Sequence, residues 1–262
     1  MRDHHSPFAA KAVLTLLLAS APSVLPAAPR YSAWSAPLNL GAVVNSASFD
    51  FGPCLSEDGR SLYFASRRPD GLGGSDIYVS QRASVHAPWG PPQILGPNIN
   101  TASDDQGPTL SPDGRQLYFF STRPGGFGST DLYVARRLHK RDDFEWQAAE
   151  NLGPSINTKA SEAGAALFED EDTTILYFQS DRPGGRGGID IYAATRDKDE
   201  DDGPFSVPVL VEELSSASND RVPANRRDGL EMFLDSDRPE RSGASTSGPP
   251  RGGAPRTAGR RR

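Results

Sequence analysis

Four copies of one short motif divide the chain into similar units, and this repeat limits its possible folds more than any other feature. Each copy consists of a serine, one variable residue and Arg-Pro. The copies are Ser66–Pro69, Ser121–Pro124, Ser180–Pro183 and Ser236–Pro239, and they are spaced by 55, 59 and 56 residues. Such a period is the signature of repeat architectures, in which each repeat is one supersecondary unit. We therefore expect four similar units.

Each unit contains four short segments that read as strands, separated by turns. In the second unit these segments are Gln93–Leu95, Gly107–Leu110, Gln116–Ser121 and Asp131–Ala135. The tetrapeptide Ser111-Pro112-Asp113-Gly114 is a strong turn signal between two of them. No helical period intervenes, and four-stranded sheets that repeat in this way are typical of propeller blades. The predicted fold class is all-β: a β-propeller of four-stranded antiparallel blades, with about four repeats present in a complete or an incomplete ring.

The predicted domain organisation has three parts. A signal peptide occupies residues 1–28, the propeller occupies residues 31–239, and a disordered basic tail occupies residues 240–262. Within the propeller, the repeats run near 31–82, 83–138, 139–196 and 197–239.

The first 28 residues have the order of a secretory signal. Arg2 and Lys11 precede a short apolar run, Ala12 to Ala21, and alanine- and proline-rich sequence follows. About 20 apolar residues are needed to cross a bilayer, so we expect no transmembrane segment. These features predict bacterial export and a periplasmic or secreted protein.

A longer pattern, Gly-Pro-x-Leu-Ser-x-Asp-Gly-Arg-x-Leu-Tyr-Phe-x-Ser-x-Arg-Pro-Gly-Gly-x-Gly-Gly-x-Asp-Ile-Tyr, is met with few departures by Gly52–Tyr78 and Gly107–Tyr133. In this pattern the units resemble the WD40-like propeller repeat of TolB-like proteins. The third unit departs from it, with Asp172-Thr173 in place of Asp-Gly. The resemblance covers about residues 31–239 and implies that the Gly-Pro-x-Leu strand is innermost. It implies no single function, because such propellers serve as periplasmic docking platforms and as domains fused to peptidoglycan-binding or peptidase modules.

The two ends of the propeller raise the question of ring closure. In similar propellers the strand after the unit's tryptophan is outermost, so we predict that Trp34–Leu40 completes the last blade and closes the ring. After Pro239, however, the repeat requires Gly-Gly-x-Gly-Gly-x-Asp-Ile-Tyr, and residues 240–248 do not supply it. Two interpretations of the tail stay open: an out-of-frame end, which leaves the ring open, or a basic segment that docks on anionic surfaces.

Composition excludes several classes of function. The net charge of −6 argues against a nucleic-acid partner, since such proteins need a basic face. The single cysteine, Cys54, excludes an intramolecular disulfide and a multi-cysteine metal site. The four histidines are scattered, so we predict no metal site. We also expect no cofactor, and we expect a monomer.

One acidic residue precedes the innermost strand of every unit. These residues are Asp50, Asp105, Glu162 and Asp220. In a propeller this position lies near one mouth of the central channel, where a ring of carboxylates could bind a cation or a cationic ligand. The alternative is that each carboxylate caps a turn or pairs with a neighbouring arginine.

Two further charged columns recur in nearly every unit. The arginines are Arg68, Arg123, Arg182 and Arg238, and the aspartates are Asp76, Asp131 and Asp190. Because a feature needed in every blade is usually structural, we predict that they brace the loop between the third and fourth strands of each unit. The glycine-rich loops, such as Gly125–Gly128, resemble phosphate cradles, but no helix follows them, and positive φ angles explain their glycines.

No catalytic motif is recognisable, and in particular no Gly-x-Ser-x-Gly is present. We therefore predict a non-catalytic binding scaffold rather than an enzyme, with an envelope protein, peptidoglycan or another glycan as partner. Two alternatives stay open: a carbohydrate-active propeller enzyme with a site at the channel mouth, and a truncated product without function. We also predict that Tyr118 and Phe119 lie on a core strand.

Overall fold

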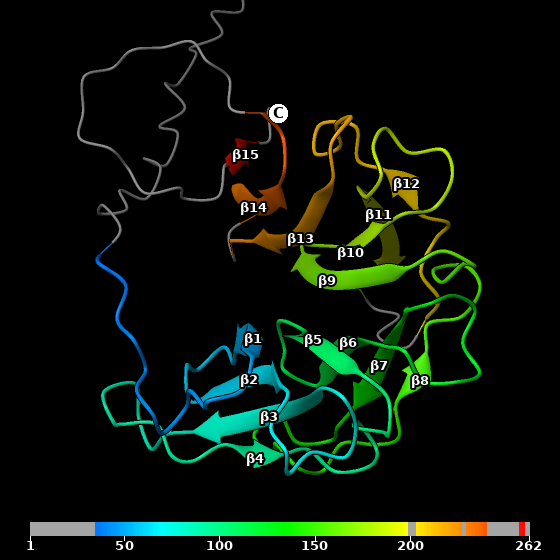
Figure 1. Ribbon diagram of the computed structural model, residues 1–262. Coiled ribbons are helices and arrows are strands. Elements are labelled where there is room, and N and C mark those ends of the chain that lie inside the picture. Colours follow the sequence, from blue (N-terminus) through cyan, green and yellow to red (C-terminus); the bar gives the residue numbers. More distant parts are fainter. Residues whose placement is uncertain (1–34, 199–202, 227–228, 240–256, 260–262) are drawn as a thin grey trace, which may run out of the picture. The chain divides into compact units, whose positions relative to one another are not determined.

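The computed structural model describes residues 35–198, 203–226, 229–239 and 257–259. Residues 1–38 and 39–262 are separate units, and every strand belongs to the second of them. The described part of this second unit consists of strands, turns and loops (Figure 1). The described residues include no helix long and apolar enough to cross a membrane. The predicted signal peptide lies outside the described residues.

The described residues form fifteen strands in four antiparallel sheets, which we call blades 1 to 4 (Figure 1). Blade 1 contains β1 (Asp50–Leu55), β2 (Ser61–Ser66), β3 (Asp76–Gln81) and β4 (Gln93–Ile94). Blade 2 contains β5 (Asp105–Leu110), β6 (Gln116–Ser121), β7 (Asp131–Arg136) and β8 (Glu150–Asn151). Blade 3 contains β9 (Glu162–Glu169), β10 (Thr173–Ser180), β11 (Asp190–Asp197) and β12 (Val209–Leu210). Blade 4 contains β13 (Asp220–Asn225), β14 (Glu231–Ser236) and β15 (Thr257–Gly259).

The predicted fold class is confirmed. In every blade the strands pair in chain order, and the first strands of successive blades contact one another: β1 with β5, β5 with β9, and β9 with β13. This arrangement is that of propeller blades around an axis, with the Gly-Pro strand innermost. The boundaries of the sheets are shifted by one strand from the boundaries of the sequence repeats. For example, β4 lies in the second repeat but pairs with β3 of blade 1.

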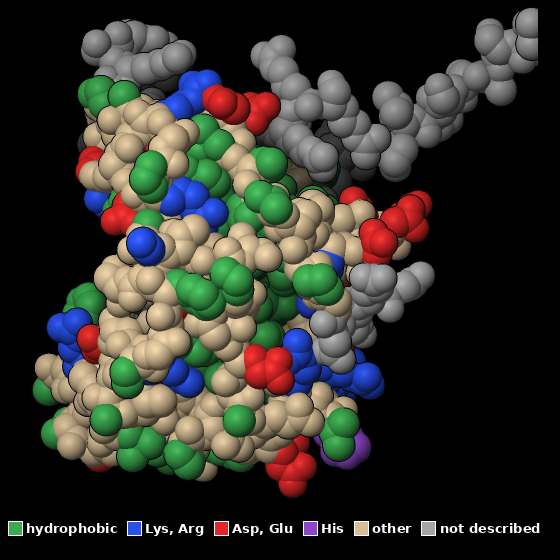
Figure 2. Space-filling view, turned by 90° about the vertical axis from the view of Figure 1, so that its right-hand side faces the viewer, with side chains coloured by type: hydrophobic (Ala, Val, Ile, Leu, Met, Phe, Trp, Pro, Cys, Tyr) green, Lys and Arg blue, Asp and Glu red, His purple; other side chains and the backbone are tan. Residues whose placement is uncertain are grey.

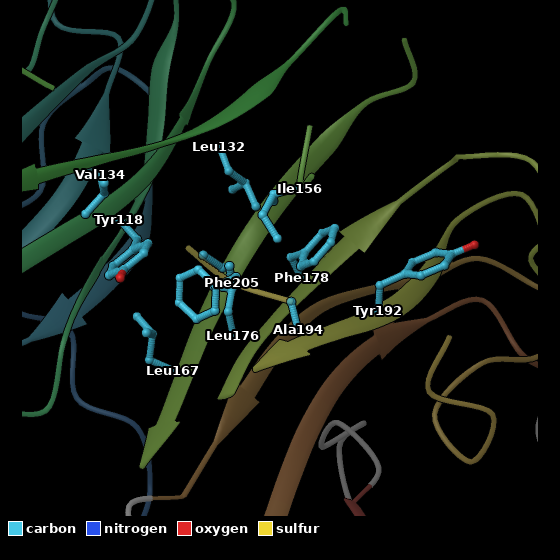
Figure 3. Close-up of a cluster of buried hydrophobic side chains, with 11 residues drawn as sticks. Tyr118, Leu132, Val134, Ile156, Leu167, Leu176, Phe178, Tyr192, Ala194 and Phe205 are labelled. Atoms are coloured by element: carbon cyan, nitrogen blue, oxygen red, sulfur yellow. The ribbon is translucent and has the colours of Figure 1, made fainter. Parts of the chain in front are cut away.

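Hydrophobic side chains are buried between blades on both faces of β6, the second strand of blade 2. On β6, Leu117 and Phe119 pack against blade 1, whereas Tyr118 points to the opposite face and packs against blade 3. Figure 3 shows the second cluster, where Tyr118 and Val134 lie near Leu167, Leu176 and Phe205. Successive side chains of a strand alternate between its faces. The continuous aromatic run of the repeat is therefore explained by burial on both sides, and the predicted core position of Tyr118 and Phe119 is confirmed.

A buried ionic network joins blade 2 to blade 1. Asp143, in the connection after β7, accepts hydrogen bonds from Ser61 Oγ (2.5 Å) and Tyr63 Oη (2.5 Å) of β2. Arg137 donates to Asp143 (2.7 Å), and its guanidinium lies 4.3 Å from the centre of the Trp146 ring. Burial and the nearby Asp143 carboxylate raise the pKa of the Tyr63 hydroxyl. The residues of this network were not singled out from the sequence.

We call Arg137 and Trp146 a clasp, because blade 3 uses equivalent residues in the same way. Arg196 of β11 donates to Gln116 Oε1 of blade 2 (2.8 Å), and its guanidinium lies 4.7 Å from the centre of the Phe205 ring. Phe205 in turn contacts Tyr118 edge to face, at 6.4 Å between ring centres. Each clasp thus reaches from one blade to the second strand of the preceding blade.

The structure does not confirm the predicted closing strand. Residues 35–40 are exposed and form no strand, and Trp34 lies outside the described residues. Among the described residues, β13 and β14 make no contact with β1–β4. Ring closure by this segment is therefore not observed.

Most of the predicted basic tail also lies outside the described residues. Its described part, Thr257–Gly259, pairs with β14 in the position that β3, β7 and β11 take in the other blades. The disordered or out-of-frame character of residues 240–262 stays a prediction.

Each innermost strand contains a bulge at the position of the repeat's Gly-Pro, with a positive φ. The residues are Gly52 (60°), Gly107 (63°), Gly164 (61°) and, in blade 4, Val222 (47°). A positive φ is unstrained for glycine but is an outlier for a β-branched residue. Blade 4 therefore retains the bulge but has a valine where the other three blades have a glycine.

Val222→Gly is expected to stabilise the protein by about 1 kcal/mol. Backbone strain of this kind costs about 1–3 kcal/mol, and the entropy of glycine in the unfolded chain offsets part of the gain. The Val222 side chain is 54% exposed, so its removal loses little buried surface. Denaturant unfolding measures the change. The reverse change at the matched bulge, Gly107→Val, should destabilise, because a Cβ there would lie 2.5 Å from Phe120; equal signs for the two variants would contradict the explanation.

Candidate functional site

The acidic column consists of the first residues of the innermost strands. Asp50 begins β1, Asp105 begins β5, Glu162 begins β9 and Asp220 begins β13. In blade 2, Asp105 accepts hydrogen bonds from the amide (2.6 Å) and hydroxyl (2.9 Å) of Thr101 and from Arg123 Nη2 (2.7 Å). The same arrangement recurs as Ser46–Asp50–Arg68, Thr158–Glu162–Arg182 and Ser216–Asp220–Arg238. Each carboxylate therefore ties the loop before its strand to the Ser-x-Arg-Pro motif of its own blade.

These carboxylates are engaged within their own blades. The side chains of Asp105, Glu162 and Asp220 have no exposed surface. Within the described residues, no group of three or more Asp, Glu, His or Cys side chains could hold a metal ion. The geometry agrees with the alternative derived from the sequence, in which each carboxylate caps a turn and pairs with an arginine.

Hydrogen bonding keeps two of these groups ionised. Burial acts to raise the pKa of Asp220, but hydrogen bonds from Arg238, Ser236 and Ser216 outweigh it and hold the pKa below its usual value. For Asp50, burial is likewise outweighed by Ser66, Ser46 and Arg68, and the pKa is lowered. A lowered pKa in the folded state means that these carboxylates stabilise the fold above their unfolded pKa and lose that contribution as the pH falls.

The arginine column connects two loops of each blade. Arg123 donates to the carbonyl of Ile99 (2.6 Å) and lies over the rings of Phe119 (5.2 Å) and Tyr133 (4.5 Å). Arg68, Arg182 and Arg238 make the same bond to Val44, Ile156 and Leu214. The arginines thus tie the loop after the second strand to the loop before the first strand, and in blades 1 to 3 they are shielded by aromatic rings.

The aspartate column braces the glycine-rich loop. Asp131 accepts from the amides of Phe127 (2.6 Å) and Gly128 (3.0 Å), and Asp76 and Asp190 make equivalent bonds. These loop amides are therefore occupied by a side chain of the same blade. The geometry leaves no phosphate cradle at these amides.

Close packing explains most of the loop glycines. Gly125 has a φ of 91°, as predicted for these loops. Gly126 and Gly128 have no positive φ, but an added Cβ would lie 1.9 Å from the Asp131 carboxylate and 1.8 Å from the Ala160 carbonyl, respectively. The prediction that positive φ accounts for the loop glycines is therefore wrong at these two positions, where the next blade and the bracing carboxylate leave no space for a side chain.

A cavity of about 470 Å³ lies between the innermost strands of all four blades. Its wall is mainly apolar, with Leu55, Leu110, Leu167, Phe168 and Pro223 contributed by different blades. Polar side chains also line it: Glu57, Ser111, Glu169, Lys198 and Asn225. The volume is within the range of small-ligand sites, about 300–1,000 Å³.

The cavity lies at the opposite ends of the inner strands from the acidic column. Its lining residues follow the bulge, whereas Asp50, Asp105, Glu162 and Asp220 precede it. Lys198 pairs with Glu169 at 3.5 Å. The three leucines of the wall belong to the Gly-Pro-x-Leu column, which the repeat pattern assigned to the innermost strand but not to a cavity. Sequence reasoning missed Phe168, Lys198 and Asn225 because they differ from the matching residues of the other blades and so form no column.

A second cavity, of about 370 Å³, lies between the hairpin turns of blades 1 and 2. It is lined by side chains of both signs, among them Arg60, Lys140, Asp58 and Asp113. The face shown in Figure 2 likewise carries small, separate groups of basic and acidic side chains, and its described part has no continuous basic surface. Neither feature provides the basic face that nucleic-acid binding requires.

Comparison with known proteins extends to the fold only. No family model and no curated protein sequence matches the chain. Its structure is similar to TolB from Acinetobacter baumannii (17% identity, TM-score 0.48, 76% of this chain and 40% of that one). It is also similar to α-L-arabinofuranosidases from Lactobacillus brevis (16%, 0.48, 72% and 63%) and Coprinopsis cinerea (14%, 0.45, 71% and 58%). The chain thus spans less than two thirds of each of these structures, and similarity at this level carries no argument about activity.

Proposed function

We propose that the chain is a TolB-like β-propeller that acts, after export, as a non-catalytic binding scaffold whose partner engages the cavity between the innermost strands. The partner class is an envelope protein, or peptidoglycan or another glycan. One observation carries the proposal: the recurring charged side chains are engaged within their own blades, whereas the inner strands of all four blades line one common cavity with recurring leucines and with polar residues that differ between blades.

The chemistry of the cavity supports binding rather than catalysis. Its wall is apolar, and its charged groups include an internal ion pair, Lys198–Glu169. Apolar walls with a few polar groups are typical of binding sites, where the polar groups fix orientation. Three blades contribute a leucine from the same motif position, whereas Phe168, Lys198 and Asn225 occur once each in the wall, so the cavity can be specific although the blades are alike.

Leu55→Asp is expected to weaken partner binding by at least about tenfold, because it places a charge on an apolar wall where burial of a lone charge is unfavourable. Leu55 is 46% exposed and lines the cavity, so the substitution should leave the fold intact. Binding of the full chain is measured to isolated peptidoglycan and, separately, to an envelope protein fraction. Leu138→Asp, at a 75% exposed leucine outside the cavity, is the matched control.

The same preparations test for turnover. We expect no hydrolysis of a panel of polysaccharides and aryl glycosides. Turnover that Leu55→Asp abolishes and Leu138→Asp leaves intact would overturn the non-catalytic assignment. Equal binding by the two variants would instead show that the cavity is not the binding site.

A further inference from the structure

The blade-to-blade clasp is present on blade 1, where the described residues place no preceding blade against it. Arg82 follows β3 as Arg137 follows β7, and it donates from Nε to the Gly59 carbonyl (2.7 Å) as Arg137 does to Gly114 (2.8 Å). Its guanidinium lies 4.2 Å from the centre of the Trp89 ring. The geometry is that of Arg137 on Trp146 (4.3 Å) and Arg196 on Phe205 (4.7 Å).

Within its own blade the clasp on blade 1 makes the same contacts as the clasp on blade 2, and it differs in what it reaches. Arg137 and Arg196 hydrogen-bond to the second strand of the preceding blade, and Trp146 and Phe205 are buried there. Among the described residues, Arg82 makes no hydrogen bond to another blade, and Trp89 is only partly buried, against side chains of its own blade. A preformed clasp therefore lacks the strand that its two counterparts bind.

Blade 4 presents an acceptor at the matching position of its second strand. The clasp contacts Ser61 in blade 1, through Asp143, and Gln116 in blade 2, and each of these residues begins the second strand of its blade. In blade 4 this position is Glu231, whose side chain is 36% exposed and pairs with Arg226 of its own blade. Because a carboxylate has about four acceptor positions, Glu231 can accept from a second guanidinium as well. It is a stronger acceptor for that group than the Gln116 amide, because the hydrogen bond is charge-assisted.

We propose that two copies of the chain associate through these edges, with Arg82 and Trp89 of each copy docked on β14 of the other and Arg82 paired with Glu231. In such a pair both edges of each copy are used, so no edge is left to extend the assembly beyond two chains. Within one chain the two edges lie apart, since β13 and β14 make no contact with blade 1 and the two blades are the ends of the series in Figure 1. This favours a second copy over closure within the chain, and it replaces the monomer expected from the sequence.

Single charge reversals test the contact. Sedimentation equilibrium of the full chain should give twice the mass of one chain. In a pair of Arg82→Glu chains, the introduced carboxylate faces Glu231 at both junctions. In a pair of Glu231→Arg chains, the introduced guanidinium faces Arg82 at both junctions. Each variant alone should therefore weaken association at least tenfold. Arg115→Glu reverses a charge on the exposed hairpin of blade 2 and should leave the mass unchanged.

Mixing the two variants distinguishes the proposal from a folding defect. In a mixed pair one junction is native and the other has its charges exchanged, so the equimolar mixture should regain the doubled mass. Three results would overturn the proposal: a monomeric wild type, a dimer insensitive to Arg82→Glu, or a mixture that stays monomeric. A monomeric wild type in which Trp89 is protected from solvent would indicate closure within one chain. If Arg82→Glu does not fold, Glu231→Gln is used instead. On its own this variant should weaken association, and unchanged association would contradict the contact.

Discussion

Replacing Asp143 with alanine is expected to lower the free energy of unfolding by about 3–5 kcal/mol, because it leaves the Arg137 charge buried without its partner. Both side chains are almost completely buried, and Asp143 accepts hydrogen bonds from four side chains: Ser61, Tyr63, Gln81 and Arg137. Removal of the carboxylate thus also leaves donors from β2 and β3 unsatisfied. The network joins blades 1 and 2, so the loss should appear in the main cooperative transition.

Glu145→Ala is the matched control for this prediction. Glu145 carries the same charge two residues away, but it is exposed, and only its backbone amide takes part in a described hydrogen bond. Exposed substitutions of this kind change stability by about 0.5 kcal/mol or less. Urea unfolding followed by fluorescence measures both variants. A loss below about 1 kcal/mol for Asp143→Ala would show that the network is not important for stability.

The repeat columns were sufficient to predict the blades. A column of aromatic residues, a turn signal and a glycine loop recur in register, and each recurs because every blade meets the same packing problem on both faces. The hydroxyl residues four positions before each acidic residue, such as Thr101 before Asp105, also form a column. Considered together with the arginines, they are a sequence signal for the turn caps that the structure contains.

Features that occur once could not be predicted in this way. Asp143 lies in a connection that varies between units, and its partner Ser61 is 82 residues away in the sequence. Phe168, Lys198 and Asn225 of the cavity wall likewise have no matching residue of the same type in the other blades. The third unit shows the local cost of a departure from the pattern: its hairpin has Asp172-Thr173 in place of Asp-Gly, and Arg196 Nε has no hydrogen-bond partner among the described residues.

Phe119→Ala is expected to destabilise the protein by about 3–5 kcal/mol, the cost of deleting a fully buried phenylalanine ring. The Phe119 side chain is completely buried between blades 1 and 2, where it stacks on Tyr133 at 5.9 Å between ring centres. It also covers the guanidinium of Arg123, so its removal exposes the Arg123–Asp105 pair to a cavity. For a domain of this size the loss corresponds to a fall of roughly 6–20 °C in the thermal midpoint.

Phe127→Ala in the same blade separates the effect of burial from that of ring removal. Phe127 lies in the glycine-rich loop with a side chain that is 45% exposed, and its contribution to the loop is the amide that binds Asp131. The alanine variant retains that amide, so we expect a change of about 1 kcal/mol or less. Thermal unfolding of the two variants under identical conditions gives the comparison. A shift below about 2 °C for Phe119→Ala, or equal shifts for both, would refute the burial of this ring and the packing of blade 2 against blade 1.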